Sequence, residues 1–158
     1  MNIKEEFRLA LRELVYPVCV VSAYNDQTNE NHAITVSSVT SLSFDPPSIL
    51  VCINKDSSIH SSLKKDSNFN ISFLASSQTE ISNLCGTDEL SDKRFDNDFW
   101  DFKNNIGFIK NSQSVISCTI KEITNHGSHS VLFGDVVEVI KNGNTKPLLY
   151  GKGKYLDI

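Results

Sequence analysis

Apolar positions recur at every second residue, or in unbroken β-branched runs, along much of the chain, and this pattern predicts strands. The predicted strands cover residues 18–23, 33–44 (one strand or a pair), 48–53, 70–74, 114–123, 129–140 and 150–156. Asp45-Pro46-Pro47 ends the second of them, because proline cannot donate to a strand ladder. Six or seven strands at this spacing, with few helices and no βαβ alternation, favour a mainly β fold built as a closed antiparallel barrel.

Three segments are predicted to be helical. Residues 3–15 form an amphipathic pattern, with apolar side chains at helical intervals at Ile3, Phe7, Leu11 and Leu14. A short helix is expected at residues 57–65. The capping box Ser77-Gln78-Thr79-Glu80 predicts a helix from about residue 78 to residue 84 that stops at Gly86. Residues 88–105 have no clean period, so a long covering loop is expected there.

Length and charge narrow the class of protein. The 158 residues are enough for one domain, taken as residues 1–158, and the 39% apolar and 22% charged content is that of a globular protein. The net charge of −4 argues against nucleic acid or an anionic membrane as the main partner. The longest apolar stretch, residues 14–21, is about half of the roughly 20 residues that a membrane span needs. We therefore expect a cytoplasmic protein without a membrane anchor.

The sequence lacks the common signatures of side-chain catalysis. Within it there is no G-x-S-x-G, no Walker loop and no G-x-G-x-x-G motif. The four cysteines form no C-x-x-C pair, and we expect buried reduced thiols with no disulfide or zinc framework. His126 and His129 have no cysteine or acidic pair beside them, so no metal site is expected. If the protein is an enzyme, an organic cofactor is expected to supply its reactivity.

Three segments stand out as candidate sites, and each has a structural alternative. Residues 34–47 place many hydroxyls on a predicted strand, as an ordinary half-exposed strand also would. Residues 52–60 run from a buried strand into a serine-rich helix start, which is a phosphate site or merely a helix cap. Residues 126–139 carry two histidines at a turn around Gly127, which is a strand-mouth site or a plain hairpin turn.

Taken together and in this order, these segments resemble the flavin reductase-like family. The resemblance also includes Phe7-Arg8, residues 17–22, residues 69–74, Gln78, Arg94-Phe95, Trp100, Cys118 and residues 147–155, and so covers nearly the whole chain. It implies an FMN-binding split β-barrel of antiparallel Greek-key type. It further implies an NAD(P)H:flavin oxidoreductase that moves hydride from NADH or NADPH to FMN or FAD. Reduced flavin would pass to a partner monooxygenase, and the protein would be a homodimer.

The resemblance also implies which residues bind the flavin. Thr35, Ser37 and Ser38 would contact the ring edge, ribityl chain or phosphate. Cys52, Ile53 and Asn54 would present backbone groups to the ring, and Ser57 and Ser58 would hold phosphate at the helix start. Cys85 and Gly86 lie where relatives commonly carry Phe-Ala-Gly. Arg94 would meet phosphate or pair with Asp92 or Asp96.

The nicotinamide side of the site is implied by the last segment. His129 matches the histidine of a Gly-Asp-His motif that lies near the nicotinamide, and it is the candidate catalytic residue. Ser128 replaces the acidic residue of that motif, and Tyr155 is a candidate for the dinucleotide side of the pocket. No essential general base is expected. Two alternatives stay open: a flavin-binding barrel without reductase activity, and a cofactor-free dimeric barrel used for protein contact.

Overall fold

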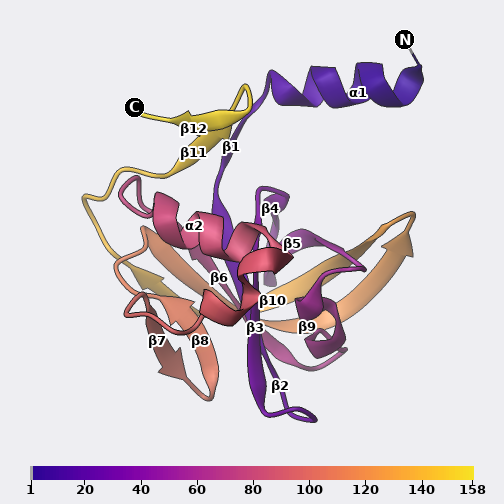
Figure 1. The fold of residues 1–158 in the computed structure, drawn as a ribbon. Helices are drawn as coiled ribbons and strands as arrows, with labels where there is room; N and C mark the ends of the chain where they lie inside the picture. Colours follow the sequence, from indigo (N-terminus) through magenta and orange to yellow (C-terminus); the bar gives the residue numbers. More distant parts are fainter. Residues whose placement is uncertain (1) are drawn as a thin grey trace.

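A computed structural model describes residues 2–158, and its largest element is an antiparallel sheet (Figure 1). The strand order is β3-β2-β6-β9-β10-β5-β4, and every pairing in it is antiparallel. These strands are β2 (Cys19–Asn25), β3 (Glu30–Val36), β4 (Val39–Phe44), β5 (Pro47–Asn54), β6 (Asn68–Phe73), β9 (Ser114–His126) and β10 (His129–Lys141). Within residues 2–158, β3 and β4 are the two edges of the sheet, so no hydrogen-bonded ring closes it.

The inner face of this sheet carries the main hydrophobic core. Side chains from strands that are far apart in this order, such as Val21 of β2 and Val51 of β5, belong to one buried cluster. The sheet therefore curls around a shared interior. Gly134 allows β10 to pack tightly there, since a Cβ at this position would lie 2.9 Å from Cζ of Phe69. Register shifts at Phe133/Gly134 and Val136/Glu138 interrupt the β9–β10 ladder, and bulges of this kind increase strand twist.

A second buried cluster lies against the other face of β2 and β3. It is covered by α2 (Thr79–Gly86) and by a hairpin of β7 (Trp100–Lys103) and β8 (Ile106–Ile109). The 3₁₀ helix η2 (Asp88–Lys93) joins α2 to the segment before this hairpin, and a second 3₁₀ helix, η1 (Ser58–Ser62), follows β5. Ile81 and Cys85 of α2 pack in this cluster with Trp100 and Val20. Both faces of β2 are thus buried, which fits its nearly continuous apolar sequence.

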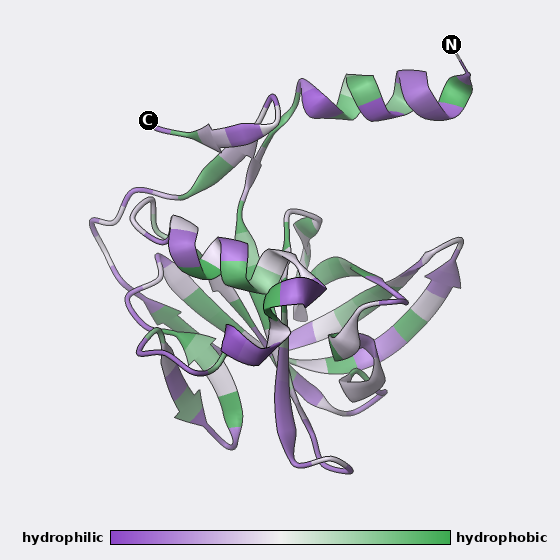
Figure 2. Ribbon diagram, in the orientation of Figure 1, coloured by the Kyte–Doolittle hydropathy of each residue, from purple (hydrophilic) through white to green (hydrophobic). Residues whose placement is uncertain are grey.

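The two ends of the chain meet in a small separate sheet. It consists of β1 (Val15–Pro17), β11 (Leu149–Gly151) and β12 (Lys154–Leu156). Before it, α1 (Ile3–Arg12) extends away from the rest of the molecule (Figure 1) and contains no buried residue. Apolar and polar residues alternate along α1 (Figure 2). Within residues 2–158, no helix is both long and apolar enough to cross a membrane.

The mainly β, antiparallel prediction is confirmed, and several local predictions are corrected. Residues 33–44 are a strand pair, residues 150–156 are a hairpin, and part of the predicted loop at 88–105 is the β7–β8 hairpin. The first helix ends at Arg12 instead of residue 15, and the helix expected at 57–65 is the short η1. The predicted capping box is wrong: Gln78 is the N-cap of α2 and makes no side-chain cap.

Candidate functional site

A cavity of about 580 Å³ lies beside the end of β3, between α2 and the β11–β12 hairpin. Four residues predicted from the sequence line it: Thr35, Ser37, Gly86 and Tyr155. Its volume lies in the range of about 300–1,000 Å³ that is typical of small-molecule sites. The structure therefore brings part of the hydroxyl-rich segment together with the C-terminal tyrosine, which is far from it in the sequence.

The polar groups of this cavity are held in place by α2. Thr35 Oγ1 donates to the carbonyl of Ser82 at 2.7 Å. The Tyr155 hydroxyl lies 2.8 Å from Ser82 Oγ and donates to Asn83 Oδ1 at 2.8 Å. The Tyr155 ring meets the Tyr150 ring edge-on, with centroids 5.4 Å apart. The cavity thus combines fixed hydroxyls with an aromatic wall, a combination that suits a polar ligand with a planar ring.

A second group of predicted residues lies where β5 ends beside the β9–β10 turn. Ser38 Oγ donates to the carbonyl of Cys52 at 2.9 Å, and Cys52 N donates back to the carbonyl of Ser38 at 3.2 Å. Asn54 is opposite His129 in the β5–β10 register. The two candidate segments at 52–60 and 126–139 are therefore neighbours in the fold.

Lys55 and Ser128 fix this turn. Lys55 donates from its backbone N to the carbonyl of Ser128 and from Nζ to the carbonyl of Gly127, each at 2.9 Å. Ser128 Oγ lies 2.8 Å from Nδ1 of the exposed His129. A hydroxyl can either donate to Nδ1 or accept from it. Ser128 therefore orients the imidazole without adding a charge.

The expected phosphate serines make internal hydrogen bonds. Ser57 precedes η1, and its Oγ donates to the carbonyl of Asn54 at 2.6 Å. Ser58 Oγ accepts from Nη1 of Arg94 at 3.4 Å. Because η1 is a five-residue 3₁₀ helix, it offers only a short run of aligned peptide dipoles. The phosphate-binding role of these serines stays a prediction.

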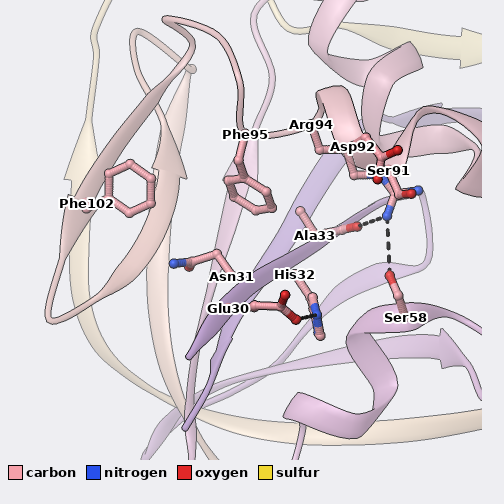
Figure 3. Close-up of a pocket in the computed structure, with 10 residues that line it drawn as sticks. All are labelled: Glu30, Asn31, His32, Ala33, Ser58, Ser91, Asp92, Arg94, Phe95 and Phe102. Carbon is pink, nitrogen blue, oxygen red and sulfur yellow. Dashed lines mark hydrogen bonds and ion pairs between the residues drawn. The ribbon is translucent and has the colours of Figure 1, made fainter. Parts of the chain in front are cut away.

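Arg94 is buried, with 4% of its surface exposed, and each of its five N–H groups has an acceptor. Nε donates to the carbonyl of Leu84 at 3.0 Å, and Nη1 donates to the carbonyl of Ala33 at 3.0 Å and to Ser58 (Figure 3). Nη2 donates to the carbonyl of Thr87 and to Asp88 Oδ1. The predicted partners Asp92 and Asp96 are therefore wrong, and the carboxylate that meets Arg94 belongs to Asp88.

Arg94 also lines a separate cavity of about 510 Å³, which lies beside residues 30–33 at the start of β3 (Figure 3). His32 and Glu30 of β3 face this space, with His32 Nε2 3.6 Å from Glu30 Oε2. A phosphate could reach Arg94 here only by replacing one of its present acceptors. The geometry thus gives Arg94 a structural role in joining β3, α2, η1 and η2.

Two predicted residues have buried side chains. Ile53 belongs to the inner core, which leaves only its backbone for a ligand, as the sequence analysis expected. The Cys85 thiol is in the second core, and desolvation raises its pKa to about 12, against a smaller lowering by Arg94. Cys85 does not line the 580 Å³ cavity, whereas its neighbour Gly86 does.

Sequence reasoning missed several residues of this cavity. Ser82, Asn83 and Leu90 line it from α2 and η2, and Tyr150 lines it from β11. None of them belongs to a recognisable motif, because they meet β3 only through tertiary packing. The tyrosine pair at positions 150 and 155 was the one local signal, since these positions bracket the Gly151-Lys152-Gly153 turn.

Solved structures of flavin reductases share this antiparallel fold, and a family model identifies the family of this chain. The family model described as "Flavin reductase like domain" matches residues 11–158. The chain belongs to this flavin reductase-like family.

Curated relatives match over most of their length. The reductase component of an FADH(2)-dependent resorcinol hydroxylase from Rhizobium sp. (strain MTP-10005) is 29% identical over 155 residues, covering 98% of this chain and 87% of that protein. The FMN reductase (NADH) RutF from Bradyrhizobium diazoefficiens is 31% identical over 137 residues, covering 84% of this chain and 76% of the relative.

Solved structures share the fold. The NADH:FAD oxidoreductase SgcE6 from Streptomyces globisporus, in complex with NAD and FAD fragments, superposes with a TM-score of 0.89 at 22% identity, covering 100% of this chain and 95% of that one. BorF, the flavin reductase component of a bacterial two-component tryptophan halogenase, gives a TM-score of 0.86 at 25% identity, covering 97% and 96%.

Proposed function

We propose that this protein is an NAD(P)H-dependent flavin reductase that transfers hydride from NADH or NADPH to FMN or FAD and supplies reduced flavin to a partner monooxygenase. The observation that carries the proposal is the cavity at the end of β3. There, hydroxyls from Thr35 and Ser37 and the ring of Tyr155 surround a space of flavin size. Relatives named as NADH-dependent FMN reductases and as an oxygenase's reductase component support the same assignment. A cytoplasmic location is part of the proposal.

The residues present fit a flavin. The chemistry that a bound flavin supplies is acceptance of a hydride from a reduced nicotinamide. Ser37, whose side chain makes no hydrogen bond within residues 2–158, is free to reach a ribityl hydroxyl or a phosphate. Thr35 and Tyr155 are held by α2, so they keep the cavity in shape before the ligand arrives. Preorganisation of this kind aligns two reactants without the help of a general base.

His129 is the proposed nicotinamide-positioning residue. It is exposed at the start of β10, and Ser128 fixes its ring through Nδ1, which leaves Nε2 facing solvent to meet a ligand. Ser128 in place of an acidic residue is the feature that keeps a second candidate function open. This alternative is a barrel that binds flavin but turns over NADH poorly.

The decisive experiment measures NADH consumption in air with FMN added stepwise, then with FAD, and repeats it with NADPH. We expect saturable oxidation that depends on flavin. His129→Ala should raise the KM for NADH about tenfold, the loss of one hydrogen bond of about 1.4 kcal/mol, and leave flavin affinity unchanged. His126→Ala is the matched control, since His126 is opposite His129 in the hairpin and is also exposed. Bound flavin without NADH oxidation would favour the second candidate.

Although Arg12 contacts the Gly151-Lys152-Gly153 turn, no residue of α1 is buried within residues 2–158, and the proposal therefore includes a homodimer that covers this helix. Its apolar residues are exposed, with Ile3 at 80% and Phe7 at 62%. An isolated ten-residue helix is marginal in water, so this surface needs a contact to keep it folded. Edge strand β4 offers a matching apolar surface, with Phe44 90% exposed. Sedimentation of wild type and Phe7→Glu tests this: a dimer is expected for the first and a monomer for the second.

A further inference from the structure

The cavity at the end of β3 continues toward the N-terminal helix. A neighbouring cavity of about 520 Å³ shares Ser37, Tyr150 and Gly153 with it. The far wall of this second cavity is basic, because Arg8, Arg12 and Lys152 line it and no acidic residue does. The chain as a whole has a net charge of −4, so the positive charge of this second cavity is opposite in sign to that of the whole chain.

Arg12 is held in this wall by the Gly151-Lys152-Gly153 turn. The backbone N of Lys152 donates to the carbonyl of Arg12 at 2.8 Å. Gly153 has a φ of +79°, and a Cβ there would lie 2.5 Å from Nη2 of Arg12. The guanidinium therefore packs directly on Gly153, a position where the positive φ favours glycine.

Within the part of the chain that the structure describes, the positive charges of Arg12 and Lys152 have no counter-ion. Arg8 pairs with Glu5, but within residues 2–158 no carboxylate lies within ion-pair distance of Arg12 or Lys152. Two uncompensated cations on one wall of a groove attract anions and hold them by charge-assisted hydrogen bonds. A guanidinium also matches the geometry of a phosphate group, to which it can donate two parallel hydrogen bonds.

We propose that Arg12 and Lys152 form an anion subsite for a phosphate group of a nucleotide whose ring system occupies the cavity lined by Thr35 and Tyr155. This inference rests on the proposed function, because it takes that cavity to be the ring site. The phosphate belongs either to the flavin nucleotide or to the nicotinamide dinucleotide, and the experiment separates these two sources.

The first arm titrates the purified full-length protein with riboflavin, FMN and FAD and follows flavin fluorescence. If the phosphate is the flavin's, Arg12→Gln should weaken FMN or FAD binding about tenfold, the ratio that corresponds to loss of one charge-assisted hydrogen bond, with riboflavin affinity unchanged. Lys154→Gln is the control for charge, because Lys154 lies in the hairpin that Arg12 contacts but lines neither cavity. Arg12→Lys should lose less, since it keeps the charge but not the bidentate geometry.

The second arm measures the KM for NADH and for NADPH with riboflavin as the acceptor. If the phosphate belongs to the dinucleotide, Arg12→Gln should raise this KM about tenfold and leave all three flavin affinities unchanged.

Two outcomes would overturn the subsite. One is an Arg12→Gln protein that matches Lys154→Gln in both arms. The other is equal weakening of riboflavin, FMN and FAD, which would give Arg12 a structural role in place of phosphate contact. Failure of the proposed function has a different signature, because wild type would then oxidise no NADH with any flavin, whatever the effect of Arg12→Gln on FMN binding.

Discussion

Replacing Arg94 with alanine tests whether this buried arginine holds the fold together or binds a ligand. Its N–H groups reach three backbone carbonyls, those of Ala33, Leu84 and Thr87, and these would lose their partner. A hydrogen bond to a charged donor contributes about 1.5–3 kcal/mol, and such losses are not additive when they share one side chain. The ion pair with Asp88 adds little, because the Asp88 side chain is 74% exposed. We expect Arg94→Ala to lower the free energy of unfolding by about 3–5 kcal/mol.

Urea unfolding followed by circular dichroism measures this loss. Arg8→Ala is the matched control, since Arg8 is exposed and pairs only with Glu5 one helical turn away, and it should cost less than about 0.5 kcal/mol. Arg94→Lys should fall between the two, at about 2 kcal/mol, because three donors on one nitrogen cannot span the same acceptors. The reasoning would be refuted if Arg94→Ala were as stable as Arg8→Ala. A stable variant that had lost FMN but not riboflavin binding would make Arg94 a phosphate ligand instead.

Three further predictions concern the core and its thiols. Gly134→Ala should lower the free energy of unfolding by about 1–3 kcal/mol, because the new methyl would meet Phe69 at 2.9 Å. Gly143→Ala is the control in the same urea assay, because nothing lies within 4 Å of a Cβ at that position. Equal stability of the two variants would contradict the packing argument. Burial raises the pKa of Cys19, Cys85 and Cys118 from 9.0 to about 12. The unfolded chain therefore releases these protons first, so stability should be full below pH 9 and should fall as the pH rises toward 12. At pH 8, a thiol reagent should modify Cys52 first, and modification of all four cysteines at equal rates would exclude this account.

The strands that could be predicted from the sequence are those whose burial follows a local pattern. In β9 and β10, buried and more exposed residues alternate over many positions, and both were found with nearly correct limits. The β7–β8 hairpin was missed, although Asn104-Asn105 carries the signal of a tight turn, with φ of 51° and 66°. Its strands have only four residues each and lie among charged residues, so their alternation is too short to recognise.

Contacts between distant segments explain the other misses. Helical spacing continues to residue 15, but Val15 leaves the helix to pair with Gly151, a partner that no local pattern reveals. Gln78 is part of a good capping box in the sequence, yet its side chain accepts from Ala75 N and donates to the carbonyl of Lys110. In the first case a tertiary strand pairing replaces the local helical turn, and in the second the Gln78 side chain bonds to Ala75 and Lys110 instead of capping α2.

Some residues of the candidate site could be predicted from local sequence, whereas others are brought to it only by tertiary packing. Hydroxyl-rich residues such as Thr35 and Ser37 were identified from composition and resemblance, and they do line a cavity. Ser82 and Asn83, which hold Tyr155, come from a helix whose sequence carries no site signal. The sequence therefore located the strand side of the site, and only the fold could supply the helix side.

The open edge of the sheet connects these observations. An unpaired edge strand exposes backbone groups that need partners, and β3 is such an edge. At Ala33 the buried Arg94 satisfies one of these groups and ties α2 and η1 to the strand. Further along the chain, Thr35 and Ser37 line the cavity of about 580 Å³. Because no strand is paired with β3 at this edge within residues 2–158, the cavity lies directly beside β3 and leaves it accessible to a ligand. Since Arg94 anchors the helix that forms the other wall, Arg94→Lys should weaken riboflavin and FMN binding by the same factor, whereas a direct phosphate contact would affect FMN alone.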